Sequence, residues 1–222
     1  MINISNRLKT IAEIILNKQS NKIIDVGCDH ALLDIYLLQN NDSLNLVASD
    51  NKKQPLENAK KNITKYSFLN KIELCLKDGI ENIDKDIDTV VISGMGEETI
   101  IDILEKDKNE LEHINRLVIS SNNKYYDLRR KITSLGYIIT DERIVFEDNK
   151  YYLIIEFIKG NKNYSEEELF MGPILINNKD DLFIKYYSDI KKEKEYILNK
   201  ITNDDDKKKT LIEEINYINK NM

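Results

Sequence analysis

The stretch Lys22-Ile23-Ile24-Asp25-Val26-Gly27-Cys28-Asp29-His30 joins a short apolar run to a glycine turn, and a helical pattern follows it. The apolar run has the length and the β-branched content of a buried strand. Gly27 permits a tight turn and a close backbone approach by a ligand, and the next helix begins with free N–H groups. We therefore expect a strand, a ligand-binding turn and a helix, in that order.

The same alternation of apolar runs and helical patterns continues on both sides of this stretch. One helix is expected over Asn3–Asn17 and another over Pro55–Tyr66, where Pro55 suits the first helical position. Alternating units of this length predict a parallel sheet with right-handed crossovers. The expected parallel strands are Lys22–Val26, Leu44–Ser49, Ile72–Leu76, Thr89–Ser93 and Leu117–Ser120.

The end of the sheet is expected to be antiparallel. Tyr137–Phe146 and Tyr151–Ile158 are strand-like, and the loop Glu147-Asp148-Asn149-Lys150 between them is short enough for a hairpin. A sheet that ends this way is typical of Rossmann-like class I methyltransferases, whereas dinucleotide dehydrogenases usually continue in parallel. The predicted fold class is therefore α/β, with a Rossmann-like sheet of the class I methyltransferase kind and a terminal antiparallel strand pair.

The sequence changes character after Gly160. Asp180–Ile201 and Asp204–Met222 each carry an apolar stripe, and capping residues lie between them. They predict an antiparallel helical hairpin, or coiled coil, about 30 Å long. We expect a methyltransferase-like domain over residues 1–160 and this hairpin domain over residues 161–222.

Composition limits the classes of function. The net charge of −6 argues against indiscriminate nucleic-acid binding. Two cysteines without a CxxC pattern and two histidines make a metal site unexpected. No apolar run has the length of a membrane span, and the N-terminal segment does not resemble a signal peptide, so we expect a cytoplasmic protein without membrane contact.

Acidic residues follow three successive predicted strands. Asp29 lies in the first turn, Asp50 ends the second strand and Asp78 precedes Gly79 after the third. Carboxylates at these positions would meet in the crevice where α/β sheets bind ligands. Asp50 could accept from ribose hydroxyls, with Asn51 beside it, and Asp78 from an adenine amine. Asp29 would repel a pyrophosphate but attract the cationic groups of S-adenosylmethionine, which favours that cofactor over NAD.

The fourth and fifth strands end in further candidate ligand contacts. Ser93, Gly94 and Met95 could lie against the transferring group, because glycine allows close backbone approach. Asn122 could hold an adenine edge with one donor and one acceptor, or could simply cap the helix expected over Tyr125–Leu135.

Three segments resemble a known family. They are Asp25-Val26-Gly27-Cys28-Asp29-His30-Ala31 with Ile35-Tyr36-Leu37, then Ser93-Gly94-Met95-Gly96, and finally Phe170-Met171-Gly172-Pro173-Ile174-Leu175. Together they resemble the bacterial tRNA (adenine(22)-N1)-methyltransferases of the TrmK family, although Asp34 stands where a proline is common. The resemblance implies transfer of a methyl group from S-adenosyl-L-methionine to N1 of adenine 22 in tRNA, with S-adenosyl-L-homocysteine as product.

The resemblance also directs the choice of site residues. Asp29 is the first candidate for a catalytic role, with His30 and Asn122 as orienting partners. Asp25, Gly27, Asp29, Asp50, Asn51, Asp78, Gly79, Ser93, Gly94 and Met95 are the expected cofactor-binding residues. The basic runs Lys52–Lys77 and Arg116–Lys131 could contact RNA or could be solvated surface; from them we predict RNA contact by Lys52, Lys53, Arg129 and Arg130.

Other functions are compatible with parts of this pattern. A small-molecule methyltransferase would use the helical hairpin as a lid or a dimer element, and a non-catalytic RNA-binding protein would keep the pocket as a relic. An NAD-dependent oxidoreductase fits least, because of Asp29 and the antiparallel strand pair. We expect tRNA as the partner, no bound metal and a monomeric chain.

Overall fold

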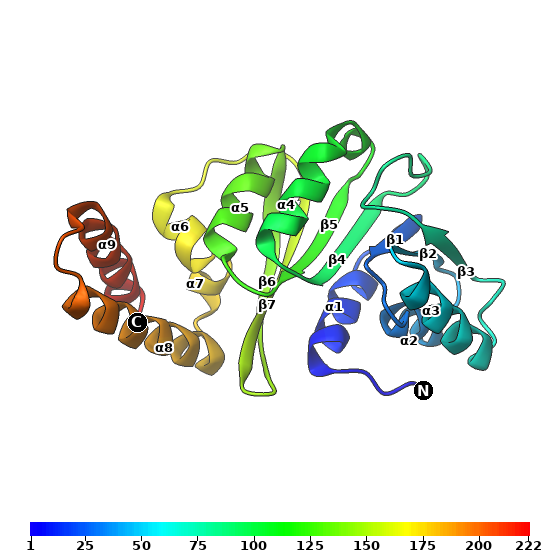
Figure 1. Cartoon of the computed structure of the whole chain (residues 1–222), viewed down its shortest axis with the longest axis horizontal. Coiled ribbons are helices and arrows are strands. Elements are labelled where there is room, and N and C mark those ends of the chain that lie inside the picture. Colours follow the sequence, from blue (N-terminus) through cyan, green and yellow to red (C-terminus); the bar gives the residue numbers. More distant parts are fainter.

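The computed structural model describes residues 1–222 and contains one sheet of seven strands, in the order β3-β2-β1-β4-β5-β7-β6 (Figure 1). The first five strands are parallel, and β7 is antiparallel to both of its neighbours. The strands are β1 (Lys22–Val26), β2 (Asn45–Asp50), β3 (Ile72–Leu76), β4 (Thr89–Met95), β5 (Arg116–Ser121), β6 (Tyr137–Glu147) and β7 (Lys150–Lys159). The predicted fold class is confirmed.

Helices cover both faces of the sheet. Successive residues of a strand point to opposite faces, so they belong to two separate hydrophobic clusters. Ile23 packs with α1, α2 and α3, whereas Ile24 packs with α4 and α5. This alternation is the period-2 pattern of a strand buried on both faces. These helices are α1 (Asn6–Leu16), α2 (Leu32–Asn40), α3 (Lys53–Lys65), α4 (Glu97–Lys106) and α5 (Tyr125–Ser134), and a short 3-10 helix over Lys108–Glu112 follows α4.

The C-terminal helices lie beyond α5, at the β6–β7 end of the molecule (Figure 1). Phe183, Tyr187 and Ile218 are buried in the same hydrophobic cluster as α5, so this segment packs onto the sheet domain rather than extending freely. None of the chain's helices combines the length and the apolar character needed to cross a bilayer. The helices are α6 (Glu166–Met171), α7 (Leu175–Asn178), α8 (Asp181–Lys200) and α9 (Asp205–Asn221).

Two local details differ from the sequence-based expectation. The β6–β7 loop has two residues instead of four, because Asp148 and Asn149 adopt φ of 50° and 58° and form the tight turn that suits a twisted hairpin. Pro55 lies at the third position of α3 rather than the first. Its missing N–H costs nothing there, because the first helical turn has no internal hydrogen-bond acceptors for its N–H groups.

A buried ion pair joins α5, β6 and the segment that leads to α8. Arg129 Nε lies 2.7 Å from Glu142 Oε1, and both side chains are fully buried. Arg129 Nη1 donates to the Leu169 carbonyl at 3.0 Å, while the Ile174 N–H donates to Glu142 Oε2 at 2.9 Å. The prediction that Arg129 contacts RNA is wrong, because its guanidinium is enclosed and already binds protein groups.

A second arginine of the basic run Arg116–Lys131 is also buried. Arg116 is 5% exposed and bonds to Glu156 and to the last carbonyls of α1. Lys124 pairs with Glu98 and Lys131 with Glu105, each with nitrogen and oxygen 2.7 to 2.8 Å apart. Charge counted along this run therefore overestimates the positive surface available to a polyanion.

The buried pair makes a testable prediction about stability. Arg129→Ala leaves Glu142 charged and without its partner, so we expect the free energy of unfolding to fall by about 3 to 5 kcal/mol. Arg130→Ala is the matched control, because the neighbouring arginine is exposed, and its effect should stay below about 0.5 kcal/mol. Urea denaturation measures both, and similar losses in the two variants would contradict a stabilising role for the pair.

Candidate active site

Two adjoining cavities lie at the carboxyl ends of the parallel strands, with volumes of about 540 and 410 Å³. They share Gly27, Asp50, Asn51 and Met95, so the turn after β1 forms the boundary between them. All predicted cofactor-binding residues line one or both cavities. The larger one adds Asp78 and Gly79, and the smaller one adds Asp25, Asp29, Ser93 and Gly94.

Gly27 has a backbone conformation that favours glycine. Its φ is +76°, and a Cβ atom there would overlap Met95 Cε, the end of a flexible side chain that would have to move. The N–H groups of Gly27 and Cys28 both donate to the Ser49 carbonyl, at 2.8 and 2.9 Å, which fixes the turn against β2. The cavities therefore meet at a point where backbone and the Met95 side chain are in close contact.

Asp50 at the end of β2 and Asp78 just after β3 present oxygens to the larger cavity. Asp50 Oδ1 accepts from the Lys52 N–H at 2.9 Å, and its other oxygen has no hydrogen-bond partner in the protein. Asp78 accepts from Asn51 at 3.3 Å and lies 3.3 Å from Lys106 Nζ. One free carboxylate oxygen beside a second, anchored carboxylate fits the hydroxyl and amine donors of a nucleoside. The residues present thus fit the adenosine part of S-adenosylmethionine.

A second acid pair lies beneath the smaller cavity. Asp25 and Asp34 are 6% and 1% exposed, and Asp34 Oδ2 has no hydrogen-bond partner within the protein. Burial raises the pKa of Asp25 to about 7, and the charge of Asp50 adds to this rise. Burial and the Asp25 charge also raise the pKa of Asp34 well above its usual range. The pair therefore holds a proton near neutral pH.

The three predicted catalytic residues do not all lie together. Asp29 and His30 line the smaller cavity, with His30 Nε2 3.4 Å from Asp29 Oδ2. Asp29 has φ of 47°, a strained conformation for a residue with a side chain. Asn122 faces a different cavity, but its Nδ2 donates to the Gly94 carbonyl at 3.1 Å. Gly94 is thus the link between Asn122 and the Asp29–His30 pair.

Two side chains of the site could not be predicted from a local sequence motif. Arg7 on α1 lines the smaller cavity, lies 5.0 Å from the Tyr152 ring centroid and approaches Gly94. Asp107, after α4, lines the larger cavity and accepts from the Ile80 N–H at 3.0 Å. Packing of distant helices brings both to the strand ends, and no motif marks either one. No cluster of histidine, cysteine and acidic side chains suited to a metal is present.

The predicted RNA contacts lie at the edge of this region. Lys52 and Lys53 are exposed beside the smaller cavity, at the start of α3. Arg130 is exposed on α5, and its Nη1 lies 3.4 Å from the Tyr126 hydroxyl. These three side chains, unlike Arg129, are free to meet a polyanion.

The sheet order, the reversed β7 and the acids at the strand ends define an S-adenosylmethionine-dependent methyltransferase of the Rossmann-like kind. A family model described as tRNA (adenine(22)-N(1))-methyltransferase, TrmK, matches residues 23–221. The chain belongs to this family.

Individual relatives agree with this assignment. The tRNA (adenine(22)-N(1))-methyltransferase of Bacillus subtilis is 29% identical over 194 residues, covering 84% of this chain and 81% of its own. The structure of M. capricolum TrmK with S-adenosyl-homocysteine has a TM-score of 0.84 and 34% identity, covering 98% of this chain and 96% of its own. A Streptococcus pneumoniae structure with S-adenosyl-L-methionine has a TM-score of 0.88 and 27% identity, covering 99% of both chains.

The Gly27 geometry predicts a loss of cofactor binding on substitution. Gly27→Ala must place a methyl group against Met95 in a left-handed conformation, which costs about 1 to 2 kcal/mol before any repacking. We expect S-adenosyl-homocysteine affinity to fall about tenfold or more in calorimetric titration. Gly96→Ala is the control, because φ there is −69° and no atom lies within 4 Å of the new methyl. Equal affinities in the two variants would contradict this account.

The buried acid pair predicts a specific dependence of stability on pH. The pKa of Asp25 is raised in the folded state, so between about pH 4 and pH 7 the native protein binds more protons than the unfolded chain. This contribution to the free energy of unfolding is therefore greatest at low pH and is lost as the pH rises through about 7.

Asp34 also binds a proton in the folded state, so Asp34→Asn should reduce the dependence of stability on pH without abolishing it, because burial still raises the pKa of Asp25. Urea denaturation between about pH 5 and pH 8 measures the slope, with up to roughly 1.4 kcal/mol per pH unit expected from each of the two carboxyl groups. Asp42→Asn, an exposed acid after α2, is the control. An unchanged slope in Asp34→Asn would show that Asp34 binds no additional proton in the folded state.

Proposed function

We propose that this chain transfers a methyl group from S-adenosylmethionine to N1 of adenine 22 in tRNA. The observation that carries the proposal is the pair of adjoining cavities, lined by the acids and glycines of four strand ends, in a chain of the TrmK family. The M. capricolum relative bound to S-adenosyl-homocysteine and the B. subtilis tRNA (adenine(22)-N(1))-methyltransferase support the cofactor and the reaction. Neither a small-molecule methyltransferase nor a non-catalytic RNA-binding protein accounts for both.

The residues divide into a cofactor part and a substrate part. Asp50 and Asp78 would hold the nucleoside of the cofactor, while Asp25, Gly27 and Gly94 would surround its amino-acid part. S-adenosylmethionine, when bound, supplies an electrophilic methyl group. Adenine N1 has an in-plane lone pair and needs no strong base, so the protein's main task is to position the base.

Positive charge develops on the adenine as N1 is methylated, and Asp29 is our candidate for stabilising it. Its carboxylate could accept from the exocyclic amine, which is the electrostatic counterpart of an oxyanion hole. His30, 3.4 Å away, would orient that carboxylate, and Asn122 would hold the base edge next to Gly94. Because N1 lies on the Watson–Crick edge, the base must leave its pair or stack to reach these groups.

The wider setting follows from the same assignment. We propose that the chain acts in the cytoplasm, with residues 1–160 as the catalytic unit and residues 161–222 as a helical hairpin for RNA contact. A monomer is supported by the packing of the hairpin's apolar residues within the chain, since Phe183, Leu211 and Ile218 are all buried. Lys52, Lys53 and Arg130 would contact phosphates.

The decisive experiment combines the purified chain with S-adenosylmethionine and an unmodified tRNA transcript. We expect one methyl group per tRNA at N1 of adenine 22, located by a primer-extension stop that disappears when that adenine is replaced by guanine. Asp29→Ala should lower kcat about 100-fold, because it removes the stabilising carboxylate. Near-normal turnover with intact cofactor affinity would refute the role of Asp29, and methylation elsewhere would refute the substrate.

A further inference from the structure

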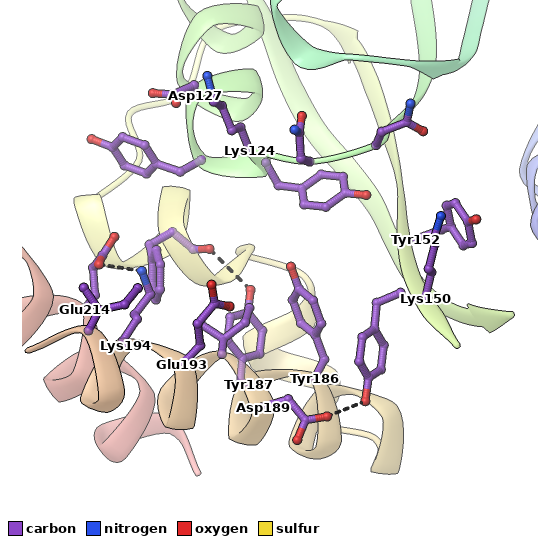
Figure 2. A pocket seen from close by; sticks show the side chains of 18 residues that line it. Lys124, Asp127, Lys150, Tyr152, Tyr186, Tyr187, Asp189, Glu193, Lys194 and Glu214 are labelled. Carbon is purple, nitrogen blue, oxygen red and sulfur yellow. Dashed lines mark hydrogen bonds and ion pairs between the residues drawn. The ribbon is translucent and has the colours of Figure 1, made fainter. Parts of the chain in front are cut away.

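A further cavity, of about 990 Å³, lies outside the cofactor cavities. It is bounded by the N-terminal turn of α5, the β6–β7 hairpin and α8 (Figure 2). We name it the tyrosine groove, after the six tyrosines that line it: Tyr125, Tyr126, Tyr151, Tyr152, Tyr186 and Tyr187.

One end of the tyrosine groove reaches the candidate active site. Asn122 lines the groove and donates to the Gly94 carbonyl at 3.1 Å, and Gly94 lines the smaller cofactor cavity. From Tyr186 to Ile197 the groove follows one face of α8 over twelve residues, or about 16 Å. A chain molecule whose reacting base lay near Gly94 could therefore place its next units along α8.

The walls of the groove are aromatic. The rings of Tyr151 and Tyr186 meet edge to face with centroids 5.1 Å apart, and Tyr186 and Tyr187 are 4.9 Å apart. Packing against each other holds these rings in place before any ligand arrives. Rigid aromatic surfaces of this kind favour planar, unstacked groups, as in proteins that bind single-stranded nucleic acid.

The polar groups in the groove favour bases over phosphates. Two of the three lysines that line the groove are paired, Lys194 with Glu214 at 2.6 Å and Lys124 with Glu98 at 2.8 Å, and the third, Lys150, is exposed on the hairpin without an ion pair. In contrast, the Glu193 carboxylate and the Tyr186 hydroxyl make no hydrogen bond within the protein, and Figure 2 shows both directed into the groove. A carboxylate repels phosphate but accepts from the amino and imino groups of nucleobases.

We propose that the tyrosine groove binds unpaired nucleobases that flank the methylated adenine, with Glu193 accepting a hydrogen bond from a base. The inference rests on the proposed function, because it takes RNA as the substrate. It makes Glu193 and Tyr186 determinants of RNA specificity, at a site separate from the cofactor cavities. The occupant is a base rather than the phosphate backbone, which should meet the exposed cations at the rim.

The test depends on the direction in which Glu193→Gln changes the affinity for RNA. Glu193→Gln removes a negative charge, so general electrostatics predicts tighter binding of a polyanion, whereas a lost base contact predicts weaker binding. We expect the KM for tRNA to rise about tenfold with kcat little changed. This is the pattern for a contact that stabilises the bound substrate and the transition state equally. Glu195→Gln is the control, since Glu195 is exposed on the same helix and does not line the groove.

A second arm identifies the occupant. Abasic nucleotides are placed one at a time beside the target adenine, and one of them should raise the wild-type KM by a similar factor. That same abasic RNA should lose nothing further with Glu193→Gln, because the two changes remove one contact. Melting temperature and S-adenosyl-homocysteine affinity should match the wild type in both variants.

The possible failures are distinguishable. If the wild-type chain methylates adenine 22 and Glu193→Gln has an unchanged or lower KM, the groove proposal is wrong while the proposed function stands. If Glu193→Gln and every abasic substitution act additively, Glu193 contacts something other than a flanking base. If the wild-type chain neither binds nor methylates tRNA, both proposals are wrong.

Discussion

The position of β1 between β2 and β4 is the constraint on which the rest of the molecule depends. Because β1 pairs in parallel with both neighbours, the chain must leave β1 toward β2 on one side and return to β4 on the other. Right-handed crossovers then place helices on opposite faces, and a crevice opens outside the carboxyl ends of β1 and β4. Gly27 follows β1 and Met95 ends β4, and the two residues meet in that crevice.

A buried ion pair and its hydrogen bonds are the second set of interactions that fix the arrangement of the elements. The Arg129–Glu142 pair and its carbonyl contacts hold the segment around Phe170 and Ile174 against α5 and β6. Tyr187 adds a hydrogen bond to the Met171 carbonyl at 2.7 Å. Since α8 forms one wall of the tyrosine groove, these contacts determine where that wall lies relative to the active site.

Sequence patterns located the strands and the cofactor residues well, for a physical reason. A strand buried on both faces must be a short apolar run, and its carboxyl end must meet the other strand ends at one edge. Asp50 and Asp78 could therefore be assigned to one crevice from their positions alone, and the structure places both around the larger cavity. Arg7 and Asp107 escaped prediction because their side chains reach the site through helix packing, which leaves no local pattern.

The charge that is free at the surface was the property that the sequence predicted least well. Arg116 and Arg129 count as cations along the chain, yet both are enclosed by acids and carbonyls from distant segments. The sequence by itself determined the order of elements, the antiparallel end of the sheet and the glycine turn at Gly27, since these follow from local periodicity and backbone freedom. Only the tertiary structure decided which charges remain free and that α5, the β6–β7 hairpin and α8 enclose a groove, because both depend on contacts between residues far apart in the chain.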